Sequence, residues 1–85
     1  RPVLVLWLDA ADAVVAAVTS ASPRSPSDVP LMNWQAAGLR VLSTARLSRL
    51  DCLEQTLLLK KLGKISAADA LRLKQVWAEQ IQLRF

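Results

Sequence analysis

The sequence predicts a small α+β domain in which a C-terminal helix covers an antiparallel sheet. Two observations indicate this class. Two short apolar segments joined by a polar turn fill the first 19 residues, and an amphipathic helical pattern fills the last 20. With 85 residues the chain is long enough for one compact unit, so we expect a single domain over residues 1–85.

The first two segments predict a β-hairpin. Val3–Leu8 is a short apolar run, typical of a strand that is buried on both faces. Asp9–Asp12 supplies polar turn residues, and Ala13–Thr19 is the returning strand. The alanines of the second segment also allow a helix, but the length of the return favours the hairpin.

The middle of the chain predicts a loop, a short helix and a third strand. Ser20–Pro30 contains three prolines and four serines, which predicts an exposed loop. Asn33–Ala37 fits one or two helical turns, with Asn33 as the N-cap and Gly38 as the left-handed residue at the end. Leu39–Leu50 alternates loosely between apolar and polar residues and predicts a strand.

Gln55–Ile65 is ambiguous. Its three consecutive leucines fit a helix by propensity, whereas its short length, Thr56 and the break at Gly63 fit a strand equally well. The resemblance described below favours the strand.

The last segment carries the clearest pattern, that of a helix. Ser66 and Asp69 resemble a capping box, in which the hydroxyl accepts a hydrogen bond from a helix N–H and the carboxylate reaches back to the cap residue. Four apolar residues then recur at helical spacing and predict one face packed on the sheet: Ala70, Leu73, Trp77 and Ile81.

The composition excludes several kinds of site. The chain has no His, which excludes histidine triads and most metal catalysis, so we expect neither a metal nor a cofactor. A single cysteine, Cys52, excludes an internal disulfide and fits a reducing compartment, so we expect a cytoplasmic protein with Cys52 as a small core residue. No apolar run exceeds six residues, and we expect no membrane association and no secretory leader.

Positive charge is concentrated in the second half of the chain. Residues 1–39 contain two cations and three anions, whereas residues 40–85 contain nine cations and four anions. This basic half allows a partner that carries phosphate, although a solvated surface explains the charge equally well.

The remaining polar side chains suit phosphate binding. Asp9 and Asp12 fall in the predicted turn, where solvated turn formers are expected rather than paired catalytic carboxylates, and the two glycines are too far apart for a phosphate cradle. Arg, Lys, Ser and Thr remain, which bind and neutralise phosphate but supply no group that titrates near neutral pH.

Several short segments follow one another at close spacing and together cover nearly all of the chain, although each is weakly specific by itself. The segments are Arg1–Leu6, Ala16–Ser20, Pro23–Leu31 and Trp34–Leu39, with Ala45–Leu47 and Lys60–Ser66 further on. Taken in this order, they resemble the MazF/PemK family, the bacterial ribonuclease toxins of type II toxin–antitoxin pairs.

This resemblance implies a strongly bent antiparallel sheet, an SH3-like, partly open barrel of the CcdB/MazF type with a short helix and a C-terminal helix. It also implies a homodimer that cleaves single-stranded RNA without a metal and is neutralised by a cognate antitoxin. Family members usually begin with a further strand and a mobile loop ahead of the Arg-Pro pair, so the resemblance also implies that this chain lacks both.

The resemblance places the functional arginine at Arg1 and the functional hydroxyl at Thr19. In such an enzyme the ribose 2′-OH attacks the adjacent phosphorus, and a guanidinium stabilises the charge that builds up on the phosphoryl oxygens. We therefore expect Arg1 and Thr19 to be catalytic. Ser20, Arg24 and Arg46 are expected to bind the RNA backbone.

Each of these residues also has an ordinary structural interpretation. Arg1 could be a charged chain end, Thr19 could end a strand and cap a loop, and Arg24 and Arg46 could be solvated. Trp34 is expected to anchor its own loop rather than to stack on a base. Two other functions stay open: a catalytically inactive module of the same fold that binds an antitoxin or a protein target, and a simple nucleic-acid-binding domain.

Overall fold

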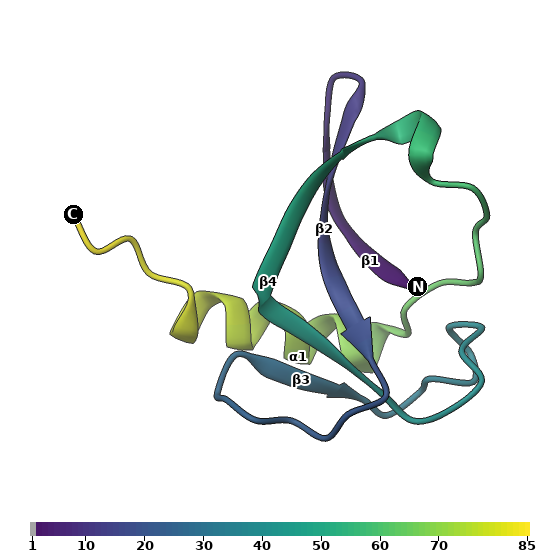
Figure 1. Cartoon of the computed structure of the whole chain (residues 1–85). Helices are drawn as coiled ribbons and strands as arrows, with labels where there is room; N and C mark the ends of the chain where they lie inside the picture. The colour runs from purple at the N-terminus through teal and green to yellow at the C-terminus, as the bar shows by residue number, and fades with distance from the viewer. Residues whose placement is uncertain (1) are drawn as a thin grey trace.

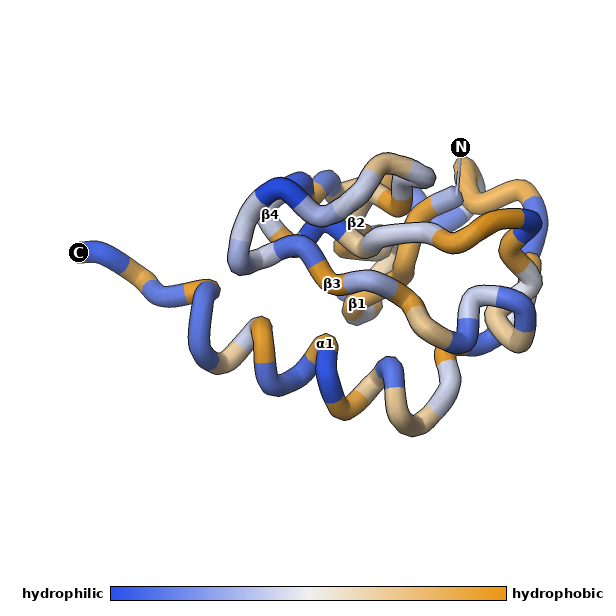
Figure 2. Tube along the Cα trace, turned by 90° about the horizontal axis from the view of Figure 1, so that it is seen from below, coloured by the Kyte–Doolittle hydropathy of each residue, from blue (hydrophilic) through white to orange (hydrophobic). Residues whose placement is uncertain are grey.

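The structure, a computed structural model, describes residues 2–85. Four antiparallel strands form one sheet in the order β1-β2-β4-β3, with the bounds Val3–Asp9 for β1, Asp12–Thr19 for β2, Asp28–Leu31 for β3 and Ser43–Glu54 for β4. A 3-10 turn, η1, covers Gln55–Leu57, and the helix α1 covers Ala67–Gln80. The sheet curves strongly, and α1 lies next to β3 (Figures 1 and 2).

The predicted hairpin is confirmed, and the helical alternative for its second strand is wrong. β1 and β2 pair from Asp9 opposite Asp12 back to Val3 opposite Ala17. Ala10 in the turn has a φ of 54°, the left-handed conformation that a tight hairpin turn requires.

The expectation that the first strand is buried on both faces is wrong. Leu4 and Leu6 are half-buried and pack against the core, whereas Val3 and Val5 are exposed on the other face. The register with β2 shifts between Val5 and Trp7, and Trp7 lies on the side of α1 but stays partly exposed. β1 is an edge strand with one face toward the core, so a continuous apolar run there leaves apolar side chains on the surface.

β3 begins inside the segment Ser20–Pro30, which was predicted to be a loop. Residues 20–27 form the expected irregular segment, but Asp28–Leu31 pairs with β4. Pro30 has no backbone N–H to donate, and β3 tolerates it because this strand is the edge of the sheet. Val29 and Leu31 are almost completely buried, which stabilises a strand that local propensity does not favour.

The predicted third strand exists but is shifted along the chain. It covers Ser43–Glu54 instead of Leu39–Leu50, and the apolar Val41 and Leu42 stay exposed before it begins. β4 continues to Glu54 because the first half of β2 needs a partner there: Asp12 lies opposite Glu54.

Two smaller elements differ from the expectation. Asn33–Ala37 is a run of turns rather than a short helix, and the Asn33 side chain accepts a hydrogen bond from the Ser66 hydroxyl (2.8 Å) instead of capping a helix. Gly38 does adopt the left-handed conformation, with a φ of 82°. Gln55–Ile65 is neither helix nor strand beyond the single turn of η1, because it extends past the last residue of β4 that has a partner in β2.

The C-terminal helix is confirmed. Leu73 is buried in the core, and Trp77 and Ile81 pack against it, as the apolar spacing predicts. The core itself lies between the concave face of the sheet and α1, and its buried members are Ala16, Val29, Leu31, Ala45, Leu47 and Leu73. Strongly hydrophobic and hydrophilic residues alternate along the tube of α1 in Figure 2.

Half of the predicted capping box is correct. The Asp69 N–H donates to the Ser66 Oγ (3.1 Å), as a cap requires. The Asp69 carboxylate does not reach back to Ser66. It accepts hydrogen bonds from the backbone N–H groups of Met32 (3.1 Å) and Asn33 (2.9 Å), because these donors at the end of β3 would otherwise be left without a partner as the helix packs there.

Candidate nucleic-acid interface

A groove of about 740 Å³ lies where β2 ends beside the first half of β4. Pro2 and Thr19 line it from the hairpin, Arg46 and Arg49 line it from β4, and Arg40 lines it from the loop that follows Gly38. The groove therefore collects three guanidinium groups and one half-buried hydroxyl, a combination that suits a phosphodiester.

Thr19 is the last residue of β2, and its side chain serves a local role as well. Its Oγ1 accepts a hydrogen bond from the Ala21 N–H (3.1 Å), which fixes the start of the following loop. The hydroxyl proton can still be donated to another acceptor, because a hydroxyl both donates and accepts. Ser20 follows, exposed, and also lines the groove.

Arg46 is held in place by a carboxylate on the neighbouring strand. Arg46 lies opposite Asp28 in the β3–β4 register, and its Nε donates to Asp28 Oδ1 (3.4 Å). Asp28 is buried, and its other carboxylate oxygen accepts from the Arg24 N–H (2.9 Å). The ion pair uses one of five guanidinium donors, so Arg46 keeps hydrogen-bonding capacity for a ligand in the groove.

The five predicted site residues separate into three groups. Thr19, Ser20 and Arg46 meet in the groove. Arg24 is exposed on the loop between β2 and β3 and is not among the groove residues. Arg1 lies outside the described residues, next in sequence to Pro2, which lines the groove and accepts a hydrogen bond from the Val18 N–H (3.4 Å).

Arg40 and Arg49 line the groove, and sequence reasoning missed both. Arg49 follows Arg46 by three positions, a spacing that places two side chains on opposite faces of a regular strand. The only available signal was their membership of the basic half of the chain.

Two glycines bring the far wall of the groove together. A Cβ on Gly38 would overlap the carbonyl oxygen of Leu62, and a Cβ on Gly63 would lie 2.5 Å from the carbonyl oxygen of Ala37. The segments 37–39 and 62–63 therefore cross in backbone contact, and Gly38 and Leu62 both border the groove.

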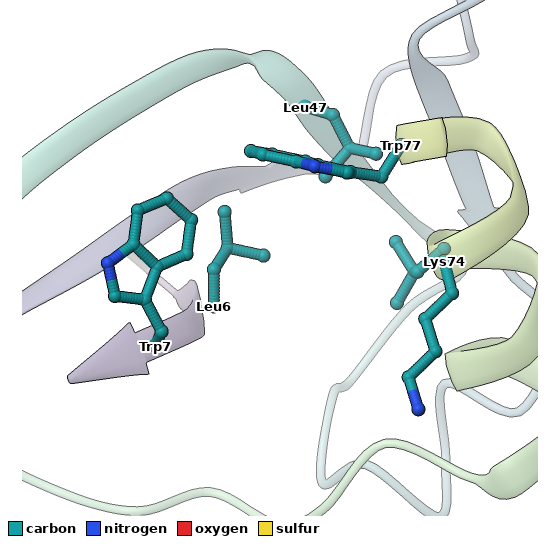
Figure 3. A pocket seen from close by; sticks show the side chains of 6 residues that line it. Leu6, Trp7, Leu47, Lys74 and Trp77 are labelled. Carbon is teal, nitrogen blue, oxygen red and sulfur yellow. The ribbon is translucent and has the colours of Figure 1, made fainter. Parts of the chain in front are cut away.

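A second, apolar cavity of about 410 Å³ lies between β1 and α1 (Figure 3). Trp7 and Trp77 contact each other there edge to face, with ring centroids 5.9 Å apart and an interplanar angle of 85°. Lys74 is the one charged residue of its lining, and Figure 3 shows its side chain directed away from both indoles. Trp77 and Trp34 pack against the core, as expected, whereas Trp7 remains 47% exposed.

Cys52 is exposed on β4, so its expected place in the core is wrong. β4 continues beyond Leu50 at the open end of the sheet, where both its faces meet solvent. Residues 2–85 contain no cluster of Cys, Asp and Glu suited to a metal ion. Within the same residues no helix has the length and apolarity to cross a membrane.

Comparison with known proteins identifies related chains. Residues 1–81 match the family model described as PemK-like, MazF-like toxin of type II toxin–antitoxin system. The fold resembles that of the Mycobacterium tuberculosis toxin MazF-mt6, with a TM-score of 0.82 and 20% identity over 100% of this chain and 89% of that one. A crystal structure of a toxin of Mycobacterium tuberculosis matches with a TM-score of 0.79 and 20% identity, over 93% of this chain and 90% of the other.

No curated protein gave a significant match to the chain. At 20% identity the two structural matches establish the fold alone. They confirm the expected fold class, a bent, partly open antiparallel sheet with one C-terminal helix, while the short helix of that expectation is replaced by turns.

Proposed function

Because the chain belongs to the family of PemK-like and MazF-like toxins of type II toxin–antitoxin systems, we propose that it is an endoribonuclease that cleaves single-stranded RNA without a metal ion and is neutralised by a cognate antitoxin. One observation carries this proposal: the Thr19 hydroxyl and the Arg46 guanidinium line the same groove, beside Pro2. A hydroxyl and a guanidinium that share a groove can both bind the oxygens of one phosphodiester.

In the proposed reaction the substrate supplies the nucleophile. The ribose 2′-oxygen forms a bond to the adjacent phosphorus, and the bond from phosphorus to the 5′-oxygen of the next nucleotide breaks. The 2′-hydroxyl proton leaves to water and the 5′-oxygen takes a proton from water, so the products carry a 2′,3′-cyclic phosphate and a 5′-hydroxyl. The protein's contribution is to align the strand for in-line attack and to stabilise the charge on the phosphoryl oxygens.

Arg1 and Thr19 are the proposed catalytic residues. Arg1 is bonded to Pro2, a residue of the groove. A guanidinium stays protonated at all ordinary pH values, so we assign to Arg1 the stabilisation of phosphoryl charge rather than proton abstraction. Thr19 donates its hydroxyl proton to the same oxygens while its Oγ1 continues to accept from the Ala21 N–H.

The proposed contacts to the RNA backbone come from both sides of the groove. Ser20 and Arg46 contact the strand within it, and Asp28 keeps the Arg46 side chain oriented. Arg24, on the exposed loop beyond the groove, contacts RNA that extends past the cleavage site.

The proposed protein partners are a second copy of the chain and the antitoxin. β1 forms an edge of the sheet and presents Val3, Val5 and Trp7 to solvent, and such an edge is usually covered by a partner. The apolar cavity beside Trp7 also favours a second candidate function, that of an inactive module that binds a protein target through an inserted apolar side chain.

The test is cleavage of a single-stranded RNA by the purified chain in excess EDTA, with the ends analysed for 2′,3′-cyclic phosphate. We expect Thr19→Ala to lower the rate at least about 100-fold, the cost of removing one donor to a developing oxyanion, and Arg1→Ala to lower it as well. Thr19→Ser retains the hydroxyl and should preserve most of the activity. Thr56→Ala, an exposed residue of η1, is the matched control.

Three results would contradict the proposal. Cleavage by Thr19→Ala at the wild-type rate would remove Thr19 from the site. A requirement for an added divalent metal would contradict the metal-free reaction. Tight binding of an antitoxin by a wild-type chain that cuts no RNA would select the inactive module.

A further inference from the structure

The register between β2 and β4 breaks inside the groove. Ala17 lies opposite Arg46, but its neighbour Ala16 lies opposite Leu50. One step along β2 therefore corresponds to four steps along β4, and Leu47, Ser48 and Arg49 have no register partner in β2. β4 bends sharply along its length (Figure 1), as a strand does at a bulge.

This bulge changes the direction of the side chains that follow it. Leu47 enters the core and is 1% exposed, whereas Arg49 lines the groove together with Arg46. In a regular strand two residues three positions apart point to opposite faces of the sheet. The bulge is therefore the feature that brings a second arginine of the same strand into the groove.

The arginines of the groove differ in whether a carboxylate neutralises their charge. Arg46 is paired with the buried carboxylate of Asp28. Among residues 2–85 the two ion pairs are Arg46–Asp28 and Arg72–Asp69, so the exposed Arg40 and Arg49 have no carboxylate partner there. Two uncompensated guanidinium groups in one groove attract an anion with more than one charge along its length.

We propose that Arg49 and Arg40 are substrate-binding residues, which hold the phosphates of a nucleic-acid strand that flank the scissile one. The proposal rests on the function proposed above. In it, the bulge of β4 directs the Arg49 side chain into the groove. Arg49 lies on the sheet, and Arg40 lies on the loop that the Gly38–Gly63 contact fixes in place. Two separate elements of the fold therefore bind the nucleic-acid strand.

The alternative is that Arg49 only stabilises the bulge through its aliphatic stem, and the salt dependence of binding separates the two roles. Each phosphate contact on a single strand contributes about 0.7 to the slope of log affinity against log salt concentration. The probe is a single-stranded deoxyribonucleotide 12-mer, which lacks the 2′-OH and stays intact during the measurement.

We expect Arg49→Gln to weaken binding of the 12-mer and to lower the slope by about 0.7. Between 50 and 200 mM salt the variant then loses about 2.6-fold less affinity than the wild type does. Arg40→Gln should behave in the same way, and Arg49→Lys should restore the wild-type slope. The matched control is Arg84→Gln, which removes the same charge from an exposed residue after α1, outside the groove.

Three results would each overturn the inference. The slope of Arg49→Gln could equal that of the wild type, Arg84→Gln could lose as much slope as Arg49→Gln, or the wild-type chain could fail to bind the 12-mer. RNA cleavage by the same variants, measured alongside binding, distinguishes failure of this inference from failure of the proposed function. If wild-type RNA cleavage is lost with Thr19→Ala but Arg49→Gln keeps its slope, the inference alone fails. If Arg49→Gln lowers the slope and the wild type cuts no RNA, the nuclease function fails and the binding site stands.

Discussion

Replacement of Asp69 by Ala tests the contact that fixes α1 to the sheet. Asp69 is completely buried, and its carboxylate accepts hydrogen bonds from the Met32 N–H (3.1 Å) and the Asn33 N–H (2.9 Å) at the end of β3. It also pairs with Arg72, whose Nη2 donates to the Pro30 carbonyl oxygen as well (3.3 Å). A single carboxylate thus joins the helix to the edge strand of the sheet.

The expected magnitude follows from the donors that the substitution leaves without an acceptor. The two N–H groups are partly buried where they meet Asp69, and each that loses its acceptor costs about 1–3 kcal/mol. The Arg72 side chain is 39% exposed, so it turns to water and adds less than about 1 kcal/mol. We therefore expect Asp69→Ala to lower the free energy of unfolding by about 2–6 kcal/mol, a large share of the roughly 4–13 kcal/mol typical of a domain of this size.

Urea unfolding followed by tryptophan fluorescence measures this loss, because Trp34 and Trp77 pack against the core beside α1. Glu79→Ala is the control: it removes the same charge from an exposed position of α1, so it should change the free energy of unfolding by less than about 0.5 kcal/mol. A loss below about 1 kcal/mol for Asp69→Ala, or an equal loss for Glu79→Ala, would refute this account of the contact.

Two further substitutions test the groove wall and the helix cap. Gly63→Ala places a Cβ 2.5 Å from the Ala37 carbonyl oxygen. We expect this overlap to lower the free energy of unfolding by about 1–3 kcal/mol. We also expect it to weaken binding of the deoxyribonucleotide 12-mer, because the two segments form one wall of the groove. Urea unfolding and a binding titration check both effects, and an unchanged unfolding midpoint would show that the two segments separate freely. Ser66→Ala removes the acceptor of the Asp69 N–H and should cost about 1 kcal/mol, whereas Ser66→Thr keeps the cap; equal stability of these two variants would contradict the capping role.

The local elements could be predicted because their signals lie within a few residues. The hairpin follows from two apolar segments and a polar turn, and the helix follows from the Ser66 cap and the spacing of Leu73, Trp77 and Ile81. Gly38 was identified as left-handed because glycine adopts that conformation without steric cost. The resemblance that indicated the family also rests on local segments, and the family match confirms it.

The errors in the fold all depend on pairing between distant residues. Pro30 predicts a loop, and it lies in a strand because β3 is at an edge and its neighbours are buried. Gln55–Ile65 has a composition that fits a helix or a strand, but within residues 2–85 no neighbouring strand lies beside it to pair with. The same dependence explains Asp69, since its partners in the chain are 36 and 37 residues away.

The candidate site shows the same division. The sequence alone determined that the chain carries arginines and hydroxyls suited to phosphate and no histidine, because composition needs no coordinates. The tertiary structure decided which of them meet: the β2–β4 register brings Thr19 and Arg46 into one groove and leaves Arg24 outside it. The bulge interrupts the alternation of β4, so that Arg46 and Arg49 line the same groove. No periodicity in the sequence reveals it, because an irregular register arises only when two strands pair.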